Sequence, residues 1–260
     1  TIQLLDSTGI MLMDKGHEWA KGNGRINGLK IHTIYDNALK CPVHFSITSA
    51  NVNDIEEAKK VGIKPNKIYV FDKGYCDFFW WNKINQKGSY FVSRLKKGVR
   101  YEVKKVNKTV GGNILEDKII ELTARSGKQY KSLLRYVEVV IGPKKNIILL
   151  TNNLKSSAEE IAKLYKERWK IELFFKCIKQ NLKIKRFWGK SENAVKLQII
   201  VAMIAYVLLR LIQMASFTAY SLKEVGVLVR INLGCTVAIN KIMKPPKKAH
   251  ASKTSGWVNL

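Results

Sequence analysis

At residues 164–179 the chain reads LYKERWKIELFFKCIK, a stretch around which the other elements can be placed. It contains neither Gly nor Pro. Ser156-Ser157 followed by Glu159-Glu160 is typical of a helix start with acidic residues in the first turn. We therefore expect one continuous helix here. Its apolar side chains, such as Ile171, Phe174 and Ile178, share one arc, which predicts that this arc packs against the core.

A stripe of four polar side chains borders that apolar arc. Its members lie within about 60° of one another around an α-helix and are Tyr165, Arg168, Glu172 and Lys179. One interpretation is a surface ladder in which Arg168 pairs with Glu172 at i, i+4 spacing, worth roughly a few tenths of a kcal/mol. The other is a functional stripe, with a carboxylate for a metal ion flanked by a phenol and two cations that bind phosphate. Helix geometry leaves both open.

The composition points to a polyanionic partner. The chain has 260 residues, with 46 Lys and Arg against 20 Asp and Glu, a net charge of +26. Such an imbalance indicates nucleic acid most simply. A hydrophobic content of 46% is enough for a real core, and the length suits one large domain or one domain with an insertion.

Cysteine and histidine spacing argues against several other classes. The four cysteines form no Cys-x-x-Cys pair, which argues against a zinc ribbon and against a secreted disulfide scaffold. The four histidines show no ligand spacing, so we expect no zinc site. A reducing cytoplasm fits best. The apolar run Ile199–Leu209 falls short of the roughly 20 residues that span a bilayer, so we expect a core helix and no membrane partner.

The first part of the chain predicts a sheet with one acidic residue at a strand end. Ile2–Asp6 is a strand that delivers Asp6 at its carboxyl end, and Ser7-Thr8-Gly9 is expected to turn. Strands at Leu29–Tyr35 and Pro42–Thr48 complete an antiparallel meander. Asn53 and Asp54, with Glu56 and Glu57 three residues on, signal a short helix and give Asp54 a capping role.

A second acidic residue repeats this placement. The apolar strand Lys67–Phe71 ends abruptly in Asp72-Lys73-Gly74-Tyr75. Next we expect a helix from about Asp77 to Gln86 and a strand at Ser89–Leu95. A set of short β-strands then runs to about Leu150 and is followed by two long helices. We predict Trp80 and Trp81 to be core residues. The expected domains are 1–95, the first part of a catalytic core; 96–150, a β-rich insertion; 151–218, the second, helical part of the core; and 219–260, a helical and basic tail.

Three acidic residues thus arise from three distant elements. A mixed sheet flanked by helices can bring strand ends and a packed helix together, so Asp6, Asp72 and Glu172 could share one Mg²⁺ site. Without metal, three crowded carboxylates would repel one another. With two hard cations they form a ligand set for in-line phosphoryl transfer, in which one metal lowers the pKa of the attacking group and the other stabilises the leaving oxygen.

At this point the sequence resembles the catalytic core of bacterial insertion-sequence transposases of the DDE type, a ribonuclease H-like α/β fold. One subgroup of these proteins interrupts the fold with a β insertion and carries a Tyr-x2-Arg-x3-Glu-x6-Lys signature, here with its spacing intact. The resemblance runs from Asp6 to about Ser216. It rests on Asp6-Ser7-Thr8, on Asp72-Lys73-Gly74-Tyr75 and on the signature residues Tyr165, Arg168, Glu172 and Lys179.

The resemblance implies a role for each of these residues. Asp6, Asp72 and Glu172 would hold two Mg²⁺ ions, for which Mn²⁺ substitutes, while Tyr165, Arg168 and Lys179 would grip phosphates around the scissile bond. It further implies double-stranded DNA as partner, both as terminal inverted repeats and as target, and cut-and-paste transposition through a freed 3′-OH. We expect a homodimer in the synaptic complex, located in the bacterial cytoplasm at the nucleoid.

Some alternatives stay open. Lys183, Lys185 and Arg186 are either solvated charges or contacts to the DNA backbone, and we favour contact. The resemblance implies an upstream DNA-binding domain, whereas this chain starts five residues before Asp6 and has no initiator Met, so we expect a fragment. No Trp lies between Trp81 and Trp169, which leaves DNA hairpin formation undecided. The rival functions are a truncated, non-catalytic DNA-binding remnant and a ribonuclease H-like nuclease without strand transfer.

Overall fold

The computed structural model describes residues 1–260 except 13–14, 21–27, 110, 144, 182–186 and 244–260. The chain divides into two compact units, Thr1–Met203 and Ile204–Leu260. The predicted site residues fall in the first unit, and three of them, Lys183, Lys185 and Arg186, lie outside the described residues.

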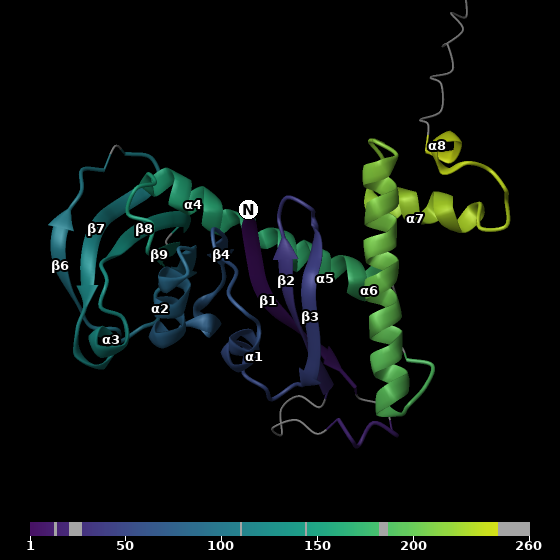
Figure 1. The fold of residues 1–260 in the computed structure, drawn as a ribbon, viewed down its shortest axis with the longest axis horizontal. Coiled ribbons are helices and arrows are strands. Elements are labelled where there is room, and N and C mark those ends of the chain that lie inside the picture. Colours follow the sequence, from purple (N-terminus) through teal and green to yellow (C-terminus); the bar gives the residue numbers. More distant parts are fainter. Residues whose placement is uncertain (13–14, 21–27, 110, 144, 182–186, 244–260) are drawn as a thin grey trace, which may run out of the picture. The chain divides into compact units, whose positions relative to one another are not determined.

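One mixed sheet of nine strands forms the frame of the first unit (Figure 1). Its strands are β1 (Ile2–Met11), β2 (Gly28–Asp36), β3 (Cys41–Ser49), β4 (Ile68–Val70), β5 (Tyr90–Arg94), β6 (Tyr101–Val106), β7 (Ile114–Leu122), β8 (Leu134–Gly142) and β9 (Lys145–Thr151). They lie in the order β3-β2-β1-β4-β5-β9-β8-β7-β6. The three central strands β1, β4 and β5 run parallel, and the other neighbouring pairs are antiparallel. This confirms the predicted α/β class and the antiparallel meander of the first three strands.

The helices of the chain follow the predicted order, with additions. They are α1 (Asp54–Lys60), the 3₁₀ turn η1 (Lys73–Tyr75), α2 (Phe78–Gln86), α3 (Ala124–Gln129), α4 (Ala158–Glu167), α5 (Trp169–Asn181), α6 (Glu192–Ala215), α7 (Leu222–Ile231) and α8 (Ile239–Ile242). The predicted start of α4 is confirmed, because Ser157 and Glu160 form a reciprocal capping box. The short helix α3 lies within the segment predicted to be β-rich.

The first strand runs further than its sequence predicted. Ser7-Thr8-Gly9 was expected to turn, but β1 continues to Met11. Its antiparallel ladder with β2 sets Ser7 opposite His32 and Gly9 opposite Lys30. Cross-strand pairing over this length outweighs the local turn preference of three small residues, because each extended residue gains ladder bonds and a facing side chain. Asp6 therefore lies within a strand rather than at its end.

An aromatic cluster joins the sheet to α2. The Trp81 ring is fully buried, lies 4.6 Å from the Phe91 ring centroid and 6.1 Å from that of Phe71, and its Nε1 donates to the Tyr75 carbonyl at 3.0 Å. Trp80 is 4% exposed. Both tryptophans are core residues, as predicted.

Helices cover both faces of the sheet. Helices α1 and α2 pack on the face that carries the aromatic cluster. Helices α4 and α5 lie on the opposite face, where Phe174 packs on Tyr35 of β2 (Figure 1).

Strands β6 to β9 come from the segment predicted to be β-rich and extend the sheet beyond β5. The ladder between β5 and β9 pairs Val92 with Thr151, so this part of the chain continues the sheet. The boundaries 1–95, 96–150, 151–218 and 219–260 stay a prediction.

Helix α6 is longer than the apolar run within it. It has 24 residues, and by length and composition alone it could cross a membrane, although a core helix passes the same test. Val195, Ile199 and Met203 are buried along one side, as expected for a core helix. Leu197, Val201 and other apolar residues of the same helix are exposed.

Candidate active site

Two aspartates meet where β1 and β4 part. These parallel strands pair Leu4 with Val70, the last pair of their ladder. Asp6 and Asp72 each lie two residues further along, so the register that joins the strands also brings the two carboxylates to the same edge of the sheet. The negative charge of Asp72 contributes to raising the pKa of Asp6, which is consistent with this proximity.

Asp6 lies in a partly closed environment. Its side chain is 19% exposed, and its Oδ1 accepts a hydrogen bond from the Ser7 amide at 2.8 Å. Burial raises the pKa of the Asp6 carboxyl to about 6, although the Ser7 amide and the Arg168 charge both act to lower it. Because burial makes the charged form of Asp6 unfavourable, a cation next to this carboxylate would stabilise it strongly.

The second aspartate is oriented in the same manner. Asp72 caps the 3₁₀ turn η1, and its Oδ1 accepts from the Gly74 amide at 2.7 Å. Its carbonyl accepts from the Ser93 hydroxyl at 3.2 Å. A side chain at position 74 would stand 2.8 Å from Asp72 Oδ1, so glycine leaves room for the carboxylate to lie over the turn.

Glu172 lies in the first turn of α5, next to a break in the predicted helix. The expected continuous helix is interrupted at Arg168, which separates α4 from α5. Around the break the Arg168 amide bonds to the Tyr165 carbonyl, and the Ile171 amide bonds to the Arg168 carbonyl. These i, i+3 bonds replace the α-helical i, i+4 pattern over one turn. The break lies within the signature stripe itself.

Arg168 joins the first and third acidic residues. One of its guanidinium nitrogens, Nη1, donates to Asp6 Oδ2 at 2.8 Å, and Nη2 donates to Glu172 Oε1 at 2.5 Å. The predicted pairing of Arg168 with Glu172 is therefore present, but it is part of a bridge to Asp6. In the described part of the chain no three acidic, His or Cys side chains lie close enough to hold one metal ion as they stand. The guanidinium occupies the place between two of the carboxylates.

The other two signature residues, Tyr165 and Lys179, lie on α4 and α5. The Tyr165 ring centroid lies 5.8 Å from the guanidinium carbon of Arg168. Burial raises the pKa of Tyr165, while the charges of Arg168 and Arg94 act to lower it. Lys179 is half-buried on α5, two turns beyond Glu172.

Sequence analysis missed Arg94. It ends β5, the strand that runs parallel to β4 and lies next to it, so it reaches the same edge of the sheet as Asp72. The signal was present in the sequence as a basic residue at the carboxyl end of an apolar strand. It becomes meaningful only once the strand order is known.

Most of the chain matches one protein family. Residues 1–208 match the family described as "Transposase DDE domain". A protein of Sinorhizobium fredii named as a transposase is 43% identical over 215 residues, covering 81% of this chain and 60% of that protein. A protein of Geobacillus stearothermophilus, named as the transposase of insertion sequence element IS5377, is 28% identical over 214 residues, or 80% of this chain and 56% of that protein. This chain thus spans somewhat more than half the length of these relatives.

A solved structure has the same fold. The piggyBac transposase in a synaptic complex with hairpin DNA matches with a TM-score of 0.56 over 98% of this chain and 60% of its own, at 11% identity. This likeness confirms the predicted ribonuclease H-like architecture.

Proposed function

The chain belongs to the family of transposase DDE domains, and on that premise we propose that it cuts the ends of a mobile DNA element and joins the freed 3′-OH to target DNA. Proteins of this family use divalent metal ions and act on DNA. In this chain Asp6, Asp72 and Glu172 would hold two ions, Mg²⁺ or Mn²⁺. The observation that supports the proposal is that Arg168 bridges Asp6 and Glu172, while the charges of both Asp72 and Glu172 act on the Asp6 carboxyl.

The donor set suits a hard divalent cation. Mg²⁺ and Mn²⁺ prefer carboxylate oxygens, and these three residues supply them. The guanidinium of Arg168 between Asp6 and Glu172 acts as a stand-in cation, because it shows that the two carboxylates already converge on a positive charge. When bound, the ions would lower the pKa of an attacking water or 3′-OH and stabilise the leaving oxygen.

The chain's own backbone orients the aspartates for that task. The Ser7 amide holds Oδ1 of Asp6 and the Gly74 amide holds Oδ1 of Asp72. Each carboxylate is thus fixed through one oxygen while the other oxygen can face a cation. Fixing the ligands before binding reduces the entropy that ordering them would otherwise cost.

Arg168 has two roles in this proposal. Without metal it neutralises Asp6 and Glu172. When the carboxylates take up cations, the guanidinium turns toward a DNA phosphate, for which its planar fork of donors is well suited. Tyr165, Lys179 and Arg94 would contact neighbouring phosphates, and Lys183, Lys185 and Arg186 would extend this basic surface.

The partners follow from the reaction. We propose double-stranded DNA as both terminal inverted repeat and target, bound largely through the +26 net charge. A homodimer would bring two DNA ends together. The protein would act at the nucleoid in the bacterial cytoplasm.

Strand transfer of a pre-cleaved DNA end tests this proposal, because it bypasses the nicking step. The substrate is a duplex that carries the 3′-OH terminus of the element's inverted repeat, incubated with plasmid DNA and Mn²⁺. We expect joined product from the parent chain and none from Glu172→Gln. Glu159→Gln is the matched control, since Glu159 is an exposed acid on α4; it should join as well as the parent.

The outcomes separate the rival functions. If the parent and Glu172→Gln both bind DNA in a salt-sensitive manner and neither joins nor cuts it, the chain is a non-catalytic remnant. Mn²⁺-dependent cutting without joining would identify a nuclease.

A further inference from the structure

Asp54, the first residue of α1, does not cap the helix as the sequence predicted. Asn53 holds the N-cap position without a side-chain capping bond. The Asp54 carboxylate instead reaches β1 and β2, with 26% of its side chain exposed. The sequence predicts a local role for Asp54 because an acidic residue at a helix start normally bonds to the backbone of its own helix. Its actual partners lie 24 and 47 residues away in the sequence.

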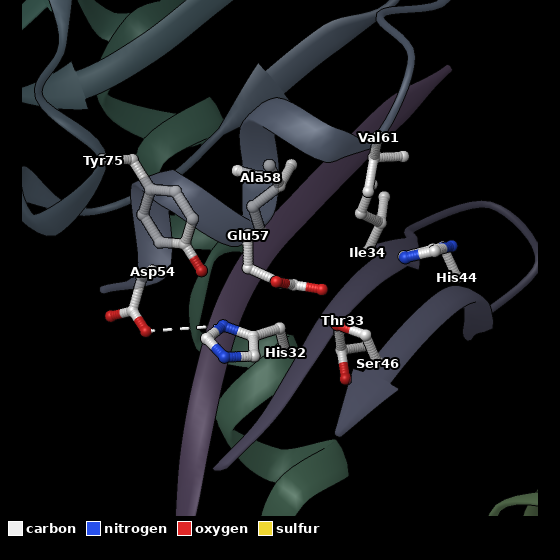
Figure 2. A pocket seen from close by; sticks show the side chains of 11 residues that line it. His32, Thr33, Ile34, His44, Ser46, Asp54, Glu57, Ala58, Val61 and Tyr75 are labelled. Carbon is white, nitrogen blue, oxygen red and sulfur yellow. Dashed lines mark ion pairs between the residues drawn. The ribbon is translucent and has the colours of Figure 1, made fainter. Parts of the chain in front are cut away.

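Two donor groups from the sheet converge on one oxygen of this carboxylate, and a histidine ring lies beside it. Asp54 Oδ1 accepts from the Ser7 hydroxyl at 2.7 Å and from Lys30 Nζ at 3.1 Å, and His32 Nδ1 lies 3.5 Å away. Figure 2 shows Asp54 facing the His32 ring. The other ring nitrogen of His32 is tied to the Thr48 hydroxyl at 2.9 Å. Lys30 places a positive charge next to the half-buried carboxylate.

The two oxygens of Asp54 face the two residues that orient the predicted catalytic aspartates. Ser7, which bonds to Oδ1, uses its backbone amide to hold Asp6. Gly74, whose amide holds Asp72, is the neighbour of Oδ2: a Cβ placed on Gly74 would stand 3.7 Å from that oxygen. One side chain on α1 is therefore hydrogen-bonded to Ser7 and lies close to Gly74.

We propose that Asp54 is a positioning residue that fixes Ser7 and the η1 turn, and through them the Asp6 and Asp72 carboxylates, in the geometry that binds metal. The inference rests on the proposed metal site and adds to it a residue that makes no contact with the ions or with DNA. Residues that orient metal ligands typically alter metal affinity about 10- to 100-fold when they are removed.

The arrangement explains why an acid is needed at this position. A neutral side chain would leave the Lys30 ammonium with the Val52 carbonyl, 2.7 Å away, as its remaining partner among the described residues. Alanine, which has no acceptor oxygen, would also free the Ser7 hydroxyl. The β1 backbone at Ser7 could then shift, and Asp6 would follow, because the Ser7 amide and the Asp6 carboxylate are bonded to each other.

The test is titration calorimetry of the full chain with Mn²⁺ in the absence of DNA, alongside thermal unfolding. We expect Asp54→Ala to weaken Mn²⁺ binding about 10-fold. Asp54→Asn, which keeps an acceptor oxygen for Ser7, should weaken it less. Glu56→Gln is the matched control, because Glu56 lies in the same turn of α1 and pairs with Lys59 on the surface. It should bind Mn²⁺ like the parent.

A double-mutant cycle separates positioning from a general effect on folding. If Asp54 acts through Ser7, Asp54→Ala combined with Ser7→Ala should weaken Mn²⁺ binding no more than the stronger single change. Additive losses would overturn this route. An Asp54→Ala protein that melts earlier but binds Mn²⁺ like the parent would overturn the inference and leave only a structural role. Ser7→Ala, which removes a single oxygen, provides the test even if Asp54→Ala does not fold.

The proposed function can fail separately. If the parent binds no Mn²⁺, both the metal site and the role of Asp54 are refuted. If the parent binds Mn²⁺ and Glu172→Gln does not, while Asp54→Ala matches the parent, only the role of Asp54 is refuted.

Discussion

The guanidinium of Arg168 donates to Asp6 Oδ2 at 2.8 Å across an interval of 162 residues, and so ties the break between α4 and α5 to the first strand. The same group bonds to Glu172. Arg168 is thereby both a phosphate-binding candidate and the internal cation of the carboxylate cluster. A change at this position should therefore affect the protein differently with and without metal.

Arg168→Gln should weaken the metal-free protein and strengthen its metal binding. Two carboxylates lose their partner, which should lower the free energy of unfolding by roughly 1–3 kcal/mol. Mn²⁺ no longer competes with the guanidinium, so its affinity in the absence of DNA should rise several-fold. Strand transfer should fall all the same, since the proposed phosphate contact of Arg168 would be lost.

Titration calorimetry and thermal unfolding with and without Mn²⁺ provide the measurement. Lys170→Gln is the control, because it breaks the ion pair between Lys170 at the start of α5 and Glu167 at the end of α4. Weaker Mn²⁺ binding by Arg168→Gln than by the parent would show that the guanidinium does not compete with the metal.

The raised pKa of Asp6, about 6, predicts a pH-dependent metal affinity. Metal binding must displace the proton, so Mn²⁺ affinity should rise as pH increases from about 5 to about 7. Stability without metal should show the opposite trend. A carboxyl whose folded pKa is above its unfolded value contributes stability that is present below the unfolded pKa and is lost as pH rises through the folded one.

Titration calorimetry across this pH range measures the Mn²⁺ affinity. Unfolding without metal over the same range measures the change in stability. Asp6→Asn should remove the pH-dependent step in stability. A Mn²⁺ affinity that stays constant over the whole range would contradict the assignment of Asp6 as a ligand.

Trp81→Ala should destabilise the fold severely. The indole is fully buried against Phe91 and Phe71, and its loss leaves a cavity next to the sheet. Truncations of this kind cost about 3–5 kcal/mol. Urea unfolding provides the measurement, with Phe79→Ala as control, because Phe79 on the same helix is 57% exposed. A loss below about 1 kcal/mol would mean that Trp81 does not belong to the core.

The Asp117–Arg135 pair should anchor the entry to α4. Arg135 donates to both carboxylate oxygens of Asp117, at 2.9 and 2.6 Å, and also to the Ser156 carbonyl next to the helix cap. Both side chains are at most 10% exposed. Asp117→Ala leaves a buried cation unpaired and should cost about 3–5 kcal/mol.

Chemical unfolding of Asp117→Ala measures this cost. The control is Glu116→Gln, which breaks a more exposed pair with Lys118 and should cost less than about 1 kcal/mol. An equal cost for the two variants would contradict the anchoring role of the buried pair.

Local patterns in the sequence predicted most elements, because periodicity and capping are local properties. The capping box at Ser157 and the buried tryptophans are examples. Predictions failed where distant partners decide the outcome. Ser7-Thr8-Gly9 remains extended because β2 pairs with it, and the helix breaks at Arg168, whose guanidinium also bonds to Asp6. Neither effect is visible in a local window of sequence.

The candidate site shows the same division. Asp6, Asp72 and Glu172 could be picked out because acids are scarce and stand next to apolar stretches. Arg94 and Asp54 could not, since their proximity to these acids depends on strand order and on the docking of α1. Lys183, Lys185 and Arg186 stay predictions.

Anomalous X-ray diffraction from crystals of the chain soaked in Mn²⁺ tests the central claim most directly. The account predicts Mn²⁺ peaks bound by Asp6, Asp72 and Glu172, with the Arg168 guanidinium displaced from Asp6. The account would be contradicted if no Mn²⁺ peak appeared at this position and the Arg168 bridge remained intact. It would also be contradicted if Mn²⁺ were bound by other residues.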